Sequence, residues 1–82
     1  MVRIELRYHE ALVLFDFLSR EVDDNQGRRL AAIFDHPAEF WTLNAVQIAL
    51  EPALSAPFAE DYSKRLAEAR DKVMDENDPD RS

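Results

Sequence analysis

Apolar residues cover well over half of the helix predicted between residues 9 and 22, and this band constrains how the chain folds. The stripe at helical spacing consists of Ala11, Leu14, Phe15, Leu18 and Val22. Leu12 and Phe17 widen the stripe on both sides. One neighbour cannot cover a helix of this kind. We therefore expect it to lie between two other elements, or between the core and a partner chain.

The segment before this helix alternates strictly in polarity. Residues 2, 4, 6 and 8 are apolar or aromatic, and residues 3, 5 and 7 are charged. A period of two predicts a half-buried β-strand over residues 2–8. Such a strand presents unpaired backbone groups, which a second copy satisfies edge to edge in a symmetric dimer.

Polar residues and the only glycine, in the stretch 23–27, predict the end of the first helix and the main loop. Residues 28–34 fit either a short helix or a strand, and we favour a short helix or an irregular turn because two alanines give little strand propensity. A second long helix begins near Pro37 and runs to about Ala53. Phe58, in the connection that follows, is expected to be pinned to the core.

The last helix, from about residue 60 to residue 75, has a single apolar stripe and a charged outer side. That stripe consists of Tyr62, Leu66, Ala69 and Val73. Acid-first pairs four residues apart, such as Asp61 with Arg65, stabilise such a helix. The overall prediction is a mainly α fold with a short N-terminal β-strand, a small α+β domain with a three-helix core. Residues 1–75 form its single globular domain, and residues 76–82 form a mobile acidic tail.

Charge and composition narrow the classes of partner. The 82 residues carry a net charge of −7, which disfavours phosphate backbones and anionic membranes. For this reason we do not expect nucleic acid as a partner. We do not expect a membrane either, because in addition no run approaches the roughly 20 apolar residues of a spanning helix. The chain has no cysteine, which suits a reducing cytoplasm and removes disulfides as a source of stability.

Catalytic and metal-binding patterns are weak in this sequence. His9 and Asp16 are seven residues apart, about 10 Å along a helix, so they do not form a direct pair. His36 lies between Asp35 and Glu39 at a helix start, where carboxylates satisfy backbone N–H groups. We expect no catalytic residue, cofactor or metal. A small enzyme or metal binder using His9 or His36 is the minor alternative.

Polar residues flanked by apolar ones indicate where a protein partner binds. Asn44, Gln47 and Glu51 form a thin polar stripe on the second helix, and neutral amides suit an interface that excludes water. Phe17 and Leu12 flank the first helix, and the acidic loop follows it. The candidate interaction residues are Leu12, Asp16, Phe17, Asp23, Asp24, Asn44, Gln47 and Glu51.

Three blocks of sequence carry a resemblance to a known group of proteins. They are E-A-L-V-L-F at residues 10–15, the segment from Pro37 to Leu43, and P-F-x-x-x-Y at residues 57–62. With these blocks the chain resembles a family of small uncharacterised bacterial proteins of about 80 residues. The resemblance implies a bacterial cytoplasmic protein and carries over no functional residue.

The sequence thus favours a non-catalytic, acidic protein-interaction module. Inhibitor, immunity, antitoxin-like and adaptor proteins belong to this class, and a basic partner surface complements the charge. The alternative is a self-associating structural homodimer that pairs through the strand at residues 2–8.

Overall fold

The computed structural model describes residues 1–54 and 59–80, and three α-helices form its framework. The helices are α1 (Tyr8–Leu18), α2 (Ala38–Leu50) and α3 (Tyr62–Asn77). Two short helices extend the first two: the π-helix η1 (Ser19–Asp24) follows α1, and the 3-10 helix η2 (Glu51–Ala53) follows α2. The prediction for Phe58 lies outside the described residues.

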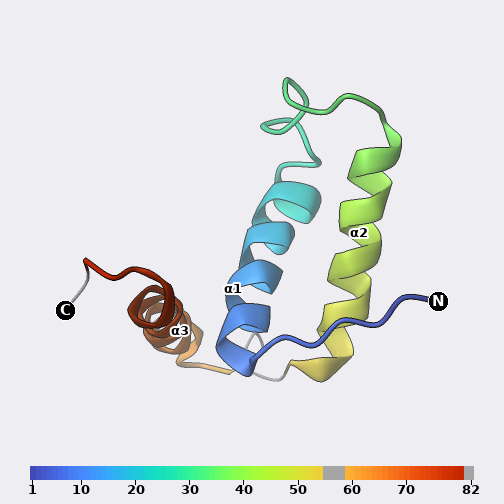
Figure 1. Cartoon of the computed structure of the whole chain (residues 1–82). Coiled ribbons are helices and arrows are strands. Elements are labelled where there is room, and N and C mark those ends of the chain that lie inside the picture. The colour runs from blue at the N-terminus through green and yellow to red at the C-terminus, as the bar shows by residue number, and fades with distance from the viewer. Residues whose placement is uncertain (55–58, 81–82) are drawn as a thin grey trace.

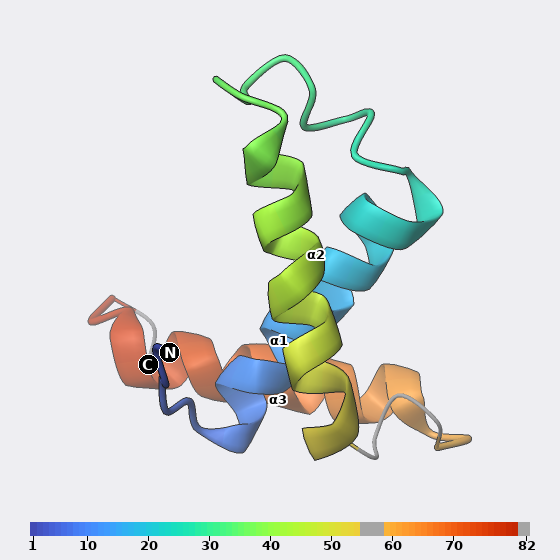
Figure 2. The same ribbon diagram turned by 90° about the vertical axis from the view of Figure 1, so that its right-hand side faces the viewer.

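Helix α1 lies between the other two α-helices. Helices α1 and α2 run side by side in opposite directions, and α3 packs on the other side of α1 (Figure 1). A quarter turn of the molecule shows that α3 runs across the direction of α2 (Figure 2). The expectation that the first helix lies between two elements is therefore confirmed.

Two apolar clusters hold the helices together, one on each side of α1. Leu12 packs between α1 and α3 with Leu66 and Ala69. In the second cluster, Ala11 and Phe15 pack against Leu54 beyond the end of α2. Two faces of one helix thus supply the apolar contacts that the sequence predicted.

The loop after η1 depends on its single glycine. Gly27 has φ +72°, and a Cβ atom added there would lie 2.7 Å from the ring of Phe40. Glycine is therefore required both for the left-handed backbone and for the approach of α2. Residues 28–34 then form successive turns rather than a helix or a strand, in agreement with the irregular turn that was favoured.

The predicted strand at residues 2–8 is not formed in the single chain. Tyr8 is the first residue of α1, and residues 1–7, here called the N-terminal segment, are extended and exposed. A strand needs a neighbouring strand, and the described residues supply none. The half-buried β-strand that alternation predicted is therefore absent from the described residues, where this segment is exposed.

Helix α3 includes the first two residues of the segment predicted as a tail. Its buried residues are Leu66 and Ala69, as the stripe predicted, and its ion pair between Asp61 and Arg65 is 2.8 Å long. Glu76 lies within the helix, which ends at Asn77. The helix is thus longer than the apolar stripe, because polar contacts described below hold its last turn.

Truncating Leu12 to alanine is expected to destabilise the domain strongly. Leu12 is only 1% exposed, and Leu12→Ala removes contacts between α1 and α3, at a cost of about 2–5 kcal/mol. Ile33→Ala is the control, because Ile33 is 72% exposed and its loss should change stability by about 0.5 kcal/mol or less. Urea denaturation followed by circular dichroism measures both. Equal losses would show that the cluster does not stabilise the fold.

Candidate partner-binding surface

Helix α2 turns its polar side inward. Gln47 is buried, and its side-chain amide donates hydrogen bonds to Asp23 Oδ2 at 2.6 Å and to Ser19 Oγ at 3.3 Å. Among the described residues, the side-chain oxygen of Gln47 is buried without a hydrogen-bond partner. These contacts fix α2 against η1 through its amide side, so Gln47 is not available to a partner.

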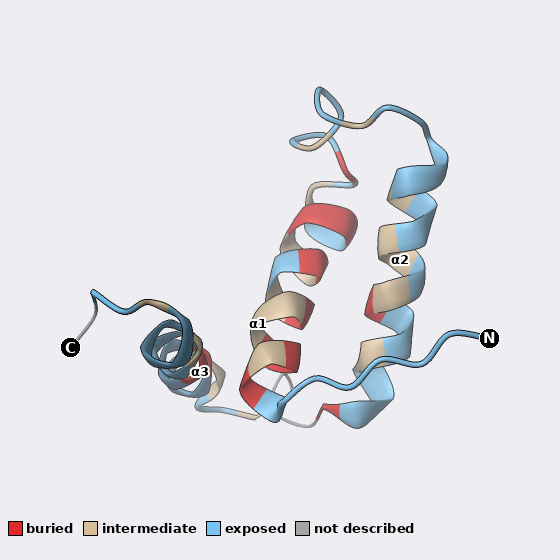
Figure 3. Ribbon diagram, in the orientation of Figure 1, coloured by how far each residue is buried: buried red, intermediate tan, exposed pale blue. Residues whose placement is uncertain are grey.

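The apolar side of α2 faces outward as a consequence. Trp41 and Ile48 are 65% and 61% exposed. Figure 3 shows α2 largely exposed, with its buried position on the side facing α1. Together with these two residues, the exposed positions at helical spacing, here called the outer stripe, are Ala38, Thr42, Ala45 and Ala49. An exposed apolar stripe of this length is typical of a protein-binding surface.

The two aromatic residues at the start of α2 point to different environments. Phe40 lies against Gly27, and its ring meets the ring of Trp41 edge to face with centroids 5.2 Å apart. Phe40 is therefore an anchor for α2, and Trp41 is the exposed member of the pair. The sequence left open which of the two is exposed.

The charged residues on the segment that carries the outer stripe are all acidic. Asp35, Glu39 and Glu51 are exposed, and the segment 35–53 contains no lysine or arginine. Glu51 lies at the beginning of η2, and Asn44 is half-buried on the inner side of α2. Of the predicted polar stripe, Glu51 alone is fully on the surface.

An apolar groove of about 820 Å³ lies between α1, α2 and the N-terminal segment. Leu14 lines it from α1, Val46 and Leu50 line it from α2, and Ile4 lines it from the N-terminal segment. Val2 and Leu6 also line it. The groove thus joins two apolar surfaces that the sequence analysis treated separately.

The candidate residues on α1 are divided between the core and the surface. Leu12 is in the core beneath α3, so no partner reaches it in this structure. Asp16 accepts a 2.6 Å hydrogen bond from the Tyr62 hydroxyl and forms ion pairs with Arg20 and Arg70. Phe17 is on the surface, with the Arg20 guanidinium 5.8 Å from its ring centroid. Asp16 and Leu12 therefore hold α3 in place.

Burial also changes the pKa of the Tyr62 hydroxyl. Desolvation and the hydrogen bond to the Asp16 carboxylate raise the pKa of Tyr62, because both disfavour the phenolate. The hydroxyl therefore remains a donor at neutral pH, and this bond ties the start of α3 to α1.

Asp23 and Asp24, expected in a loop, are the last two residues of η1. Asp23 accepts the hydrogen bond from Gln47, and both Asp23 and Asp24 are on the surface. The structure therefore brings Asp23 and Gln47 together, although the sequence placed them on separate elements.

Sequence reasoning missed an ion pair between a buried glutamate and an exposed arginine in this region. Glu21 is buried in η1, and Arg29 contacts it through two nitrogens, at 2.9 and 2.5 Å. The hydrogen bond from Arg29 is the largest effect on the pKa of Glu21 and lowers it, against the opposing effect of desolvation. A signal was present in the sequence: Glu21 lies between Leu18 and Val22, on the apolar side of the helix.

Polar contacts at the start of α1 hold the end of α3. Glu76 Oε2 lies 2.7 Å from Arg7 Nη1 and 2.9 Å from His9 Nε2. The hydrogen bond with His9 is the largest cause of a lowered pKa of Glu76, and Arg7 adds to it. His9 was expected at an exposed edge, but it is buried because α3 covers this side of α1.

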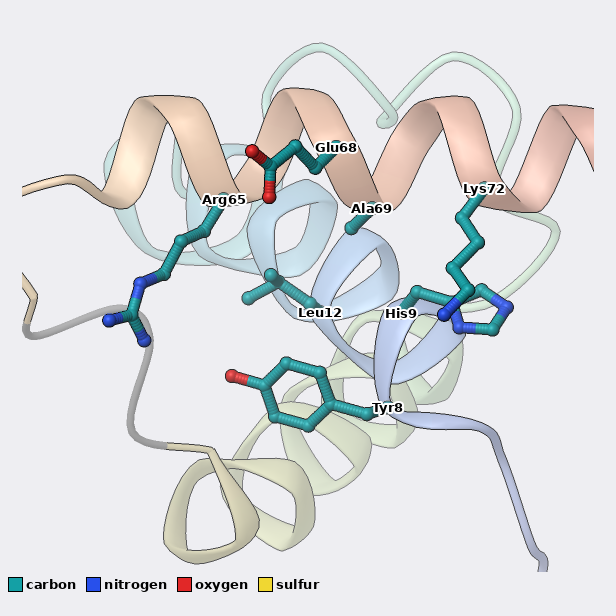
Figure 4. A pocket seen from close by; sticks show the side chains of 7 residues that line it. All are labelled: Tyr8, His9, Leu12, Arg65, Glu68, Ala69 and Lys72. Carbon is teal, nitrogen blue, oxygen red and sulfur yellow. The ribbon is translucent and has the colours of Figure 1, made fainter.

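A pocket of about 240 Å³ lies beside His9, between α1 and α3. Figure 4 shows Arg65 and the Tyr8 hydroxyl at one end, and His9 with Lys72 at the other. Arg65 is paired with Asp61, and His9 is paired with Glu76. The polar groups of this pocket therefore serve packing between the two helices rather than converging on one point.

His36 acts at the start of α2. Its Nδ1 accepts a 3.0 Å hydrogen bond from the Ala38 backbone N–H, and Glu39 accepts one from the Asp35 backbone N–H at 3.2 Å. Both side chains thus satisfy backbone groups at the helix start. No group of three or more metal-ligating side chains occurs among the residues that the structure describes.

Comparisons of the chain with protein-family models, curated proteins and solved structures find no match. Within residues 1–54 and 59–80, no helix has both the length and the apolar character needed to cross a bilayer.

The ion pair between Glu21 and Arg29 predicts that the folded domain loses stability in acid. The pKa of Glu21 is lower in the folded state than its ordinary value of 4.5, so the unfolded state binds more protons as the pH falls. The stability from this pair is complete above pH 4.5 and is lost as the pH falls through the folded-state pKa. We expect Glu21→Gln to reduce the slope of unfolding free energy against pH in this acid range.

Urea denaturation between about pH 7 and about pH 3 measures this slope. Glu76→Gln is the matched control at the other lowered carboxyl, and it should leave the contribution of Glu21 in place. An unchanged slope in Glu21→Gln would show that the Arg29 pair does not contribute to acid stability.

Proposed function

We propose that this protein is a non-catalytic interaction domain that binds a protein partner through the outer stripe of α2. The observation that carries this proposal is the orientation of α2, which buries Gln47 and exposes Trp41 and Ile48. Exposing large apolar side chains to water is unfavourable, by about 25 cal/mol per Å² of apolar surface. A partner that covers the stripe removes this cost.

The charge around the stripe specifies the partner further. Asp35, Glu39 and Glu51 are exposed on the segment 35–53, which contains no lysine or arginine, and the whole chain carries −7. A partner with an apolar patch surrounded by basic residues complements this surface and associates faster at low salt. Inhibitor, immunity, antitoxin-like and adaptor proteins act in this way, and we propose a cytoplasmic location, which a cysteine-free chain suits.

Self-association is the second candidate, and a separate observation favours it. The N-terminal segment is extended, exposed and alternating, and Ile4 in its centre is 71% exposed. Its unpaired edge accepts another strand without using Trp41 or Ile48. The two candidates therefore depend on different surfaces and are separable by mutation.

Substitution in the outer stripe is expected to abolish partner binding. Tagged wild-type protein is recovered from its source organism at low salt, and the proteins that accompany it are identified by mass spectrometry. Ile48→Glu places a charge in the centre of the stripe and should lose the partner. Washing at high salt should release a basic partner from the wild type, because screening weakens charge complementarity.

Ile33→Glu is the matched control, because Ile33 is as exposed as Ile48 but lies in the turns before α2. It should retain the partner. If the same proteins accompany all three forms, or none accompanies the wild type, the outer stripe is not a partner-binding surface.

A further inference from the structure

The N-terminal segment has a free backbone edge. Among the described residues, no backbone hydrogen bond joins residues 1–6 to another segment. The first anchored residue is Arg7, whose backbone N–H donates to Glu10 and whose side chain contacts Glu76. The segment therefore leaves the domain from a fixed point, with its polar backbone groups available to another strand.

The order of charges in this segment is self-complementary. In an antiparallel pair with the two-fold axis at Ile4, Arg3 of each chain lies opposite Glu5 of the other, so both charged pairs attract. On the other side of the same ribbon, Val2 lies opposite Leu6, and Ile4 lies opposite its own copy. One register thus pairs complementary side chains on both faces of the ribbon over residues 2–6.

The neighbouring registers are unfavourable. A shift by one residue places apolar side chains opposite charged ones. An axis at Arg3 or at Glu5 places that residue opposite its own copy, and so opposes like charges. An axis at Leu6 needs Tyr8 as a strand residue, but Tyr8 belongs to α1. The charge pattern therefore selects the axis at Ile4.

The groove between α1 and α2 supplies the packing that a short ribbon needs. An isolated two-stranded ribbon is marginally stable in water. Here Val2, Ile4 and Leu6 line a groove of about 820 Å³ whose opposite walls are α1 and α2. Val2, Ile4 and Leu6 therefore meet α1 and α2 at the groove, where Arg3 also contributes to the lining, and Glu5 lies outside it.

We propose that a second copy of this chain binds the N-terminal segment as an antiparallel strand, with the two-fold axis at Ile4, and that the shared ribbon covers both grooves. The inference rests on the proposed interaction role of the domain and adds a specific partner, the chain itself. Thr42, Ala45 and Ala49 of the outer stripe line the groove, whereas Trp41 and Ile48 do not, so these two large side chains remain accessible in this dimer.

A charge exchange tests the register. Arg3→Glu alone and Glu5→Arg alone each place like charges opposite one another twice, and each should weaken the dimer about tenfold or more in sedimentation equilibrium. An equimolar mixture of these two variants opposes unlike charges again, and should form a mixed dimer of wild-type strength. The chain with both substitutions should also recover.

These variants leave the fold in place, because residues 3 and 5 are exposed and precede α1. Circular dichroism of each variant checks this directly. A monomeric wild type, or single variants that dimerise as strongly as the wild type, would overturn the proposed pairing. A mixture no stronger than its components would also overturn it.

A single cysteine tests the position of the axis, since the chain has no other cysteine. Ile4→Cys places two thiols opposite one another, with Cα atoms about 4.5–5.5 Å apart, within the range of a disulfide. Oxidised glutathione accepts the two electrons and should give a covalent dimer on a non-reducing gel. Val2→Cys is the control, because its copy lies about 13 Å away along the ribbon.

Comparison with Ile48→Glu separates the two proposals. If the wild type is monomeric but binding of a partner still depends on Ile48, the proposed dimer is refuted and the proposed function is retained. If the charge-exchange variants dimerise as expected but no partner depends on Ile48, partner binding by the outer stripe is refuted and the proposed dimer is retained.

Discussion

Helix α1 contributes buried side chains to two apolar clusters, and the positions of the other helices follow from this. Leu12 faces α3, and Phe15 faces the end of α2. A chain of 82 residues has a small core, because its surface is large relative to its volume. Helix α1 contributes more buried apolar side chains than any other described element, and α2 packs against α1 on one side only. No other element of the described residues covers the outer side of α2, where Trp41 and Ile48 are exposed.

Acidic residues in this fold are held by arginines that lie far away in the sequence. Asp16 pairs with Arg70 across 54 residues, and Glu76 pairs with Arg7 across 69. Glu21 and Arg29 close the loop between η1 and the turns that follow. A chain with seven more acids than bases thus places several of its arginines at contacts between elements, where they offset burial of carboxylates.

The sequence predicted the packing of α1 and α3 correctly, because the apolar residues of these helices follow a clear helical spacing. The double stripe of α1 predicted two neighbours, and the single stripe of α3 predicted Leu66 and Ala69 as buried. For helix α2 the sequence analysis expected Asn44, Gln47 and Glu51 to face a partner, but Gln47 is buried, so periodicity did not select the inner side. The selection comes from the Gln47–Asp23 hydrogen bond and the Gly27–Phe40 contact, which join distant residues and leave no local pattern. For the same reason, alternation over residues 2–8 did not reveal whether a neighbouring strand exists.

The ion pair between Arg7 and Glu76 affects the order in which contacts form during folding. Closing a loop of 69 residues costs more entropy than closing the local contacts of α1, so this contact forms late. During synthesis, Glu76 emerges after all three helices have begun, and until then the root of the N-terminal segment is unrestrained. Its exit direction is therefore set only once α3 has docked.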